Sequence, residues 1–106
     1  MGNKQLHKKW RVKFNKAVFD RDNFSCRKCG YTEKLDAHHI TDRHIMPQGG
    51  YVLNNGISLC EKCHIKAEEY HRTNGKSFQV GFHPNDLYKL INSSYEKALE
   101  ESKQIL

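Results

Sequence analysis

Two pairs of cysteines, each with the spacing Cys-x-x-Cys, are the most informative residues of this 106-residue chain. The pairs are Cys26 with Cys29, and Cys60 with Cys63. Two cysteines at this spacing hold their thiolates about one turn apart, a separation that tetrahedral zinc accepts. Two such pairs in a short chain predict one structural Zn²⁺ with four thiolate ligands. Two disulfides are the alternative, which the N-terminus disfavours because no apolar signal segment is visible there.

Four further polar side chains lie between the two pairs or directly after them: His38, His39, Asn55 and His64. A zinc ion with four thiolate ligands has no use for these groups. Imidazoles bind divalent ions and also accept protons near neutral pH. The set therefore predicts a second metal site that keeps an open coordination position, as hydrolytic catalysis requires. Candidate ions are Mn²⁺, Ni²⁺, Co²⁺, Mg²⁺ and Zn²⁺.

Local patterns indicate the elements that must position these residues. Residues 35–40 and 57–59 are typical of two short strands, and the Gly-, Pro- and Asn-rich residues 41–56 are typical of a loop. A helix is predicted over residues 60–72. Successive helical residues are rotated by about 100°, so His64 points toward the hairpin if Cys63 faces the zinc. The predicted fold is α+β, a small zinc-stabilised treble clef.

One helix is predicted on each side of this segment. Residues 8–21 carry apolar side chains at helical spacing, and a last helix opens at residues 84–86, with Asn85 or Asp86 as its cap. The apolar stripe of that last helix comprises Leu87, Leu90, Ile91, Ser94, Tyr95, Ala98 and Leu99. We expect the stripe to pack on the domain, and a partner surface or homodimer seam is the alternative. The prediction is one domain over residues 1–106, with its core at about 10–72 and a helical extension at about 84–105.

The chain carries a formal net charge of +6, which favours a polyanionic partner. The residues predicted to contact DNA are Lys9, Arg11, Lys13, Lys16 and Arg43. Solvated surface charge remains the alternative for each of them. No apolar run approaches the roughly 20 residues of a transmembrane helix, so no membrane partner is expected.

Taken together, these residues resemble the HNH endonuclease family, the ββα-metal nucleases. The matching positions are Cys26, Cys29, residues 37–40, residues 55–60, Cys63 and His64, with a similar lead-in at residues 18–22. The resemblance covers about residues 10–70. It implies a metal-dependent hydrolase that cuts or nicks the phosphodiester bonds of DNA, double-stranded DNA in particular.

The resemblance also implies a role for each residue of the second site. His38 takes the place of a metal ligand, His39 that of the general base, and His64 that of the second ligand. Asn55 would position His39 or touch the metal. The exchanged roles of His38 and His39 stay open, because adjacent residues of a regular strand point to opposite faces. The family usually has an acidic residue where His38 stands, and imidazole favours transition ions over Mg²⁺.

Two other functions compete with this prediction. One is a zinc module that binds nucleic acid or protein without catalysis, because a fold does not fix a function. The other is a zinc-stabilised subunit whose last helix docks on a larger phage or bacterial protein machine. Similar small proteins occur in bacteria and phages, so the expected location is the cytoplasm of a bacterial or phage-infected cell.

The remaining polar residues receive weaker predictions. His44 is a possible extra ligand, and Arg43, Lys62 and Lys66 are expected near the second site, where each could hold a phosphate. The residues predicted to lie on the surface or to be incidental are Asp36, Glu61, His7, His71 and His83.

Overall fold

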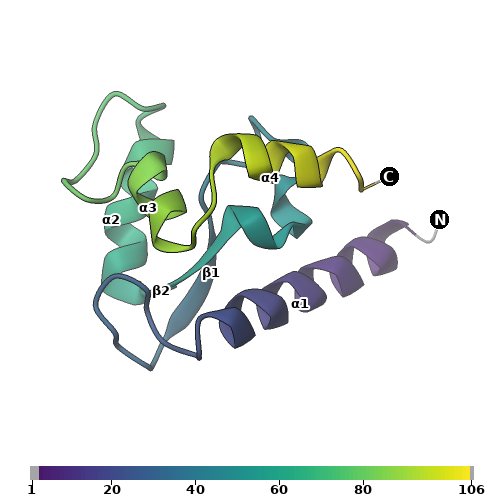
Figure 1. Ribbon diagram of the computed structural model, residues 1–106, viewed down its shortest axis with the longest axis horizontal. Coiled ribbons are helices and arrows are strands. Elements are labelled where there is room, and N and C mark those ends of the chain that lie inside the picture. Colours follow the sequence, from purple (N-terminus) through teal and green to yellow (C-terminus); the bar gives the residue numbers. More distant parts are fainter. Residues whose placement is uncertain (1–2, 106) are drawn as a thin grey trace.

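The computed structural model describes residues 3–105, with side chains from residue 6 onward. Its elements are the helices α1 (Asn3–Arg21), α2 (Glu61–Arg72), α3 (Pro84–Leu90) and α4 (Tyr95–Ser102), and the strands β1 (Leu35–His39) and β2 (Gly56–Cys60) (Figure 1). Two short 3₁₀ turns, Pro47–Tyr51 and Leu53–Asn55, lie in the long loop between the strands. This α+β arrangement confirms the predicted fold class. Among the described residues, no helix has the length and apolar character needed to cross a membrane.

The two strands form an antiparallel hairpin that separates two faces of the molecule. His38 pairs with Ile57, and His39 pairs with Gly56. Cross-strand partners point to the same face of a sheet, and neighbours along a strand point to opposite faces. Ile57 lies in the main apolar core, whereas Gly56 lies against α1. His38 therefore faces the core and α2, and His39 faces α1.

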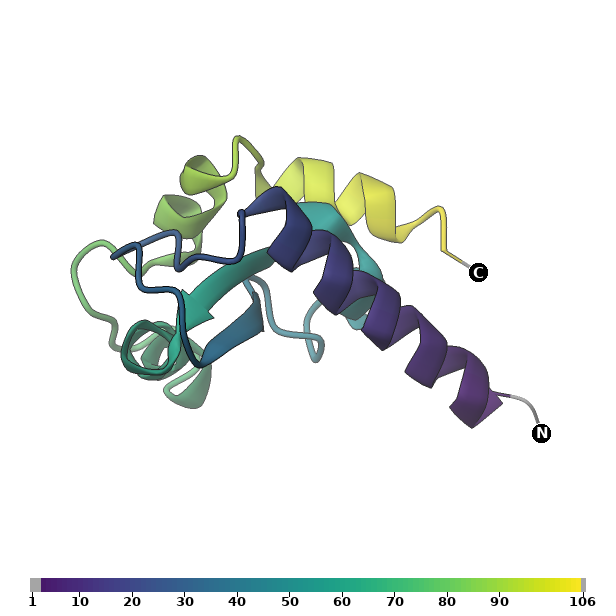
Figure 2. The ribbon, with the colours of Figure 1, turned by 90° about the horizontal axis from the view of Figure 1, so that it is seen from below.

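Helix α1 packs across one face of the hairpin through Phe14 and Val18, and its N-terminal part runs out beyond the hairpin (Figure 2). The close approach requires glycine at position 56, where a Cβ would lie 2.5 Å from the Val18 side chain. The end of α1 is fixed by Asp22, which is 1% exposed. Its carboxylate accepts a hydrogen bond from the Ser58 backbone N–H at 2.8 Å and pairs with Arg21, also at 2.8 Å.

The C-terminal extension differs from the single helix that the sequence predicts. It forms two helices, α3 and α4, because the backbone turns at Asn92, whose φ is +54°. The predicted cap of α3 is also wrong: the cap is His83, whose Nδ1 accepts from the Asn85 N–H, while Asp86 accepts from the His83 N–H. Ser94 caps α4. The break lets both short helices turn their apolar residues inward.

The main apolar core joins the hairpin to α2, α3 and α4. Three apolar residues of the predicted stripe are buried: Leu87, Ile91 and Ala98. This burial agrees with the expectation that the stripe packs on the domain. Together with Ile57 and Leu59 of β2, these three residues form one cluster, which also includes three of the four cysteines. Tyr95 of the same stripe is exposed. Since β2 is buried along its whole length, the hairpin is the centre of the molecule.

Candidate metal centres

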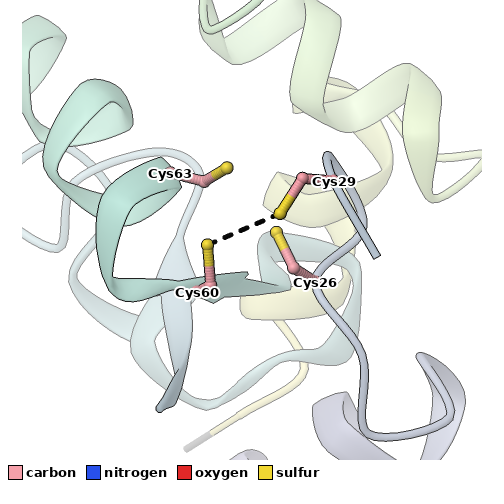
Figure 3. Close-up of side chains that lie close together, drawn as sticks. All are labelled: Cys26, Cys29, Cys60 and Cys63. Carbon is pink, nitrogen blue, oxygen red and sulfur yellow. Dashed lines mark hydrogen bonds between the residues drawn. The ribbon is translucent and has the colours of Figure 1, made fainter. Parts of the chain in front are cut away.

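The four cysteines come together at the junction of the first loop, β2 and α2 (Figure 3). Their sulfur atoms all lie within 4.8 Å of one another, and the Sγ atoms of Cys29 and Cys60 are 3.6 Å apart. Tetrahedral zinc, with Zn–S bonds of about 2.3 Å, places sulfurs about 3.8 Å apart. The two sulfur atoms of a disulfide are only about 2.05 Å apart. The predicted clustering of Cys26, Cys29, Cys60 and Cys63 is confirmed, and its dimensions suit zinc rather than disulfides.

The loop around the first cysteine pair is a tight turn whose backbone affects the pKa of Cys26. Gly30 adopts a φ of +82°, and its N–H donates to the Cys26 carbonyl at 2.8 Å. Burial raises the pKa of Cys26, but hydrogen bonds from the backbone of Cys60, Cys29 and Lys28 outweigh it and lower the pKa to about 7. Thiolate is the form that binds metal, so Cys26 is prepared for metal binding at neutral pH. At Cys29 a backbone hydrogen bond lowers the pKa, but burial and hydrogen bonds with the neighbouring cysteines outweigh it and raise the pKa.

A second group of metal-binding side chains lies between β1 and α2. It consists of His38 from β1 and of His64 and Glu68, one turn apart on α2. Each offers a ligand atom within 4.8 Å of the others. The Glu68 Oε1 lies 3.0 Å from the Nε2 of His64 and 3.4 Å from the Nδ1 of His38. Two imidazoles and one carboxylate are a recognised ligand set for a catalytic divalent ion.

The Nδ1 of His38 shows that this group is incomplete. His38 is 2% exposed, and among the described residues its Nδ1 is the sole buried side-chain nitrogen or oxygen with no hydrogen-bond partner. Leaving such an atom unpaired costs about 1–3 kcal/mol. Burial lowers the pKa of His38 to about 4, so the ring is neutral at pH 7, which is the form that binds a metal ion. The neighbouring His38 imidazole in turn lowers the pKa of Glu68 to about 2. These residues fit a divalent cation.

Two residues near this group differ from what the sequence predicts, and a third has a contact that was not foreseen. Glu68 was not predicted; its only signal is the spacing of four from His64, which places both on one helix face. Asp36 is exposed, as expected of a surface carboxylate, and its Oδ2 also lies 3.3 Å from the Nδ1 of His64. A carboxylate there orients a metal-binding imidazole. His71, also expected at the surface, is half-buried and stacks on His38 with ring centroids 5.3 Å apart.

His39 lies outside the metal-binding group, on the opposite face of the hairpin. Its ring packs on Phe14 of α1, with centroids 5.1 Å apart. Burial, followed by the charge of Arg43, lowers the pKa of His39 below its ordinary value. A backbone hydrogen bond with Gly50 opposes this shift. His39 is thus a neutral, half-buried imidazole at the last position of β1.

Among the described residues, the side chain of Asn55 makes no hydrogen bond with His39. Its amide is completely buried and is hydrogen-bonded to the loop that follows β1 and to Tyr88 of α3. The Oδ1 accepts hydrogen bonds from the Thr41 N–H at 2.8 Å and from the Tyr88 hydroxyl at 2.7 Å. The Nδ2 donates to the carbonyls of Thr41 and Gly49, both at 3.0 Å. Asn55 therefore acts on the loop, and any effect on His39 passes through that loop.

The residues predicted to contact DNA lie on α1 and on the loop between β1 and β2. Lys9, Arg11, Lys13 and Lys16 are exposed along α1, and Lys16 pairs with Asp20 at 2.6 Å. Arg43 is exposed and lies against Gly50, where a Cβ would be 3.0 Å from its Cδ.

Other candidates from the sequence lie away from the second metal group. Lys62 and Lys66 line a hollow beside the cysteine cluster, contrary to the expectation that they lie near the second site. His44 is exposed and outside both groups of metal-binding side chains.

Comparison with known proteins relates the central part of the chain to one family. Residues 26–69 match the family model described as HNH endonuclease. The matched span contains all four cysteines, the whole hairpin, and His38, His64 and Glu68. Searches of curated proteins and of solved structures found no match. The match confirms the resemblance seen in the sequence and indicates a nuclease or another nucleic-acid-related function.

Proposed function

We propose that this chain, whose residues 26–69 carry an HNH endonuclease segment, hydrolyses phosphodiester bonds of double-stranded DNA with the help of a divalent cation. The observation that carries the proposal is the buried, unpartnered Nδ1 of His38, which faces His64 and Glu68. A module that only binds nucleic acid has no use for such an atom, which a metal ion would satisfy.

Three residues would hold the cation: His38, His64 and Glu68. When bound, it would supply positive charge for the phosphoryl oxygens and for the leaving oxygen. Asp36 lies 3.3 Å from the Nδ1 of His64, and a carboxylate there would favour the orientation in which Nε2 faces Glu68. Two imidazoles and a carboxylate favour Mn²⁺, Co²⁺, Ni²⁺ or Zn²⁺ over Mg²⁺.

His39 is the proposed general base that takes the proton of the attacking water. Its lowered pKa keeps the ring neutral at pH 7, the form that can accept a proton. The hydrogen bond with Gly50 and the packing on Phe14 fix the orientation of the ring. Since His38 and His39 face opposite sides, the scissile phosphate would have to lie across the end of β1, within reach of both. Arg43, which lies beside Gly50, would bind a neighbouring phosphate.

The DNA would extend along α1. This helix carries five exposed basic side chains between residues 8 and 16, and it covers the same face of the hairpin as His39. Basic side chains in a row neutralise phosphates irrespective of base sequence. We therefore propose that α1 binds the duplex and that His39 and the metal group act at one end of that contact.

Nicking of supercoiled plasmid in the presence of Mn²⁺ tests the proposal. His39→Ala should lower the rate by roughly 10²–10⁴-fold, the usual loss for a general base, while zinc content and DNA binding are retained. His44→Ala is the matched control, because His44 is an exposed histidine of the adjacent loop. If the unsubstituted protein binds DNA but cuts none with any of these ions, it is a non-catalytic zinc module.

The same assay separates the two histidines of the adjacent pair. His38→Ala should weaken binding of Mn²⁺, measured by calorimetry, whereas His39→Ala should leave it unchanged. The reverse result would assign the base to His38 and the ligand to His39.

A further inference from the structure

The C-terminal extension lies outside the matched residues 26–69 and forms hydrogen bonds with Asn54 and Asn55. Glu101 of α4 accepts a hydrogen bond from the Asn54 N–H at 3.1 Å. Ser93 donates to the Asn54 carbonyl at 3.0 Å, and Tyr88 of α3 donates to the Asn55 side chain at 2.7 Å. Both backbone groups of one residue and the side chain of the next are thus held by residues about 33–47 positions further along the chain.

Tyr88 is the buried member of these contacts. It is 2% exposed, and its oxygen also lies 2.6 Å from the Thr41 Oγ1. The tyrosine has one proton, which it gives to the Asn55 Oδ1, because a carbonyl oxygen cannot donate. The Thr41 hydroxyl must then donate to the tyrosine oxygen. The three side chains form one network in which every polar group has a partner.

This network fixes the backbone that follows the proposed base. The Asn55 carbonyl accepts from the Ile40 N–H at 2.9 Å, and the Asn55 side chain holds both the N–H and the carbonyl of Thr41. These are the two residues directly after His39. The same side chain holds Gly49, the neighbour of the glycine whose backbone bonds His39. The Asn55 side chain thus fixes the start and the middle of the loop that follows His39.

We infer that Tyr88 is a positioning residue for the reaction, and that through Asn55 the C-terminal extension holds His39 in the orientation that catalysis needs. This inference rests on the proposed function. Tyr88 is not one of the proposed metal ligands, and it is not one of the residues proposed to contact the phosphate. Its hydroxyl acts by keeping Asn55, and with it the end of β1, in one place.

Steady-state kinetics of plasmid nicking test this role with Tyr88→Phe, which removes only the hydroxyl. We expect kcat to fall by at least about tenfold, because small misplacements of catalytic groups are costly. KM for DNA, zinc content and Mn²⁺ affinity should not change. Tyr95→Phe removes a hydroxyl from an exposed tyrosine of α4 and should leave every value unchanged. All rates are measured well below the melting temperature of each variant.

Two further readouts separate positioning from simple stabilisation. In an Asn55→Ala background, Tyr88→Phe should cause no additional loss of kcat, because both changes break the same connection. Hydrogen exchange should become faster at the Ile40 and Thr41 amides in Tyr88→Phe. An additive loss, or an unchanged kcat in Tyr88→Phe, would overturn the inference alone. An unsubstituted protein that does not nick DNA would overturn the proposed function and the inference with it.

Discussion

The ligand residues of the second metal group come from two kinds of position. His38 is completely enclosed, because it faces the core from the middle of the hairpin, and its orphan Nδ1 has no route to water. His64 and Glu68 lie on the partly exposed face of α2. A metal ion held by such a set is anchored on one side by a rigid strand and open to solvent on the other. This is the arrangement that a substrate phosphate needs.

Glu68 allows a direct test of this metal group. Glu68→Gln should weaken Mn²⁺ binding by at least about tenfold, because it removes the one charged ligand. Isothermal titration calorimetry of the zinc-loaded protein measures the change. Glu69→Gln is the matched control, since Glu69 carries the same charge on the next position of α2 but bonds Ser77 and Gln79 instead. Equal losses in both variants would mean that net charge, and not ligation, attracts the ion.

Burial of His38 predicts a dependence of stability on pH. The pKa of His38 is about 4 in the folded state and 6.5 in its unperturbed form, so the unfolded chain binds more protons between these values. The free energy of unfolding should therefore fall as the pH is lowered from about 6.5 toward 4. Between pH 7 and 5 the loss from this residue is about 2 kcal/mol, at 1.36 kcal/mol per unit.

Urea unfolding at pH 7, 6 and 5, without added divalent ion, measures this loss. His38→Asn should show a smaller decline than the unsubstituted protein, and the difference isolates His38 because zinc release is common to both. Glu68 does not interfere, since its lowered pKa affects stability only as the pH falls below 4.5 toward 2. Parallel declines in the two proteins would contradict the prediction.

At the scale of elements, α2 serves both metal groups at once. Successive residues of a helix are rotated by about 100°. Cys63 consequently points toward the cysteine cluster, while His64, Glu68 and His71 point toward β1. His71 also bonds the carbonyl of His39 through its Nε2, at 2.9 Å. The single helix α2 thereby connects the cysteine cluster, the second group of metal-binding side chains and the end of β1.

Helix α1 is the element proposed to bind DNA, and the salt dependence of binding tests it. Changing Lys9, Arg11, Lys13 and Lys16 to Gln should weaken binding and flatten the plot of log K against log salt concentration. The slope should fall by about 0.9 for each phosphate that is no longer neutralised, so by up to about 3.6. Lys16 already pairs with Asp20, so its contribution to this change of slope should be smaller than that of the other three residues.

A control with the same change of charge makes this test specific. Four exposed lysines of the C-terminal part serve for it: Lys76, Lys89, Lys97 and Lys103. Changing these four to Gln should affect the slope much less. Fluorescence anisotropy with a labelled duplex at several salt concentrations measures both variants. If the two slopes change equally, DNA contacts the protein through its overall charge, and α1 has no special part.

For the whole molecule, the cysteine cluster joins segments that the small core alone cannot hold. A bound zinc contributes on the order of 10 kcal/mol to such domains, as much as the total stability of many proteins. Removal of zinc by a chelator should therefore abolish cooperative unfolding as seen by circular dichroism, and zinc should restore it. His64→Ala should remain folded, because it affects only the second metal group. An unchanged melting curve after complete zinc removal would contradict a structural role for zinc.

The sequence by itself determined the features that depend on neighbours along the chain. The two Cys-x-x-Cys pairs predicted the sulfur cluster, because four thiolates at this spacing have few other uses. The apolar spacing of residues 8–21 predicted α1, and the Gly- and Asn-rich residues 41–56 predicted the loop between the strands. Side-chain period and turn chemistry are local properties, so they can be read without the fold.

Tertiary structure alone decided which distant residues meet. Glu68 looks like any surface carboxylate of a helix until His38 is brought beside it from β1. Asn55 was predicted to position His39 or touch the metal, and only the packing of α3 shows that it shares a buried network with Tyr88. Contacts between residues about 30 or more positions apart depend on how helices pack on the hairpin. Local patterns leave that packing undetermined, because the same apolar stripe can be buried in several ways.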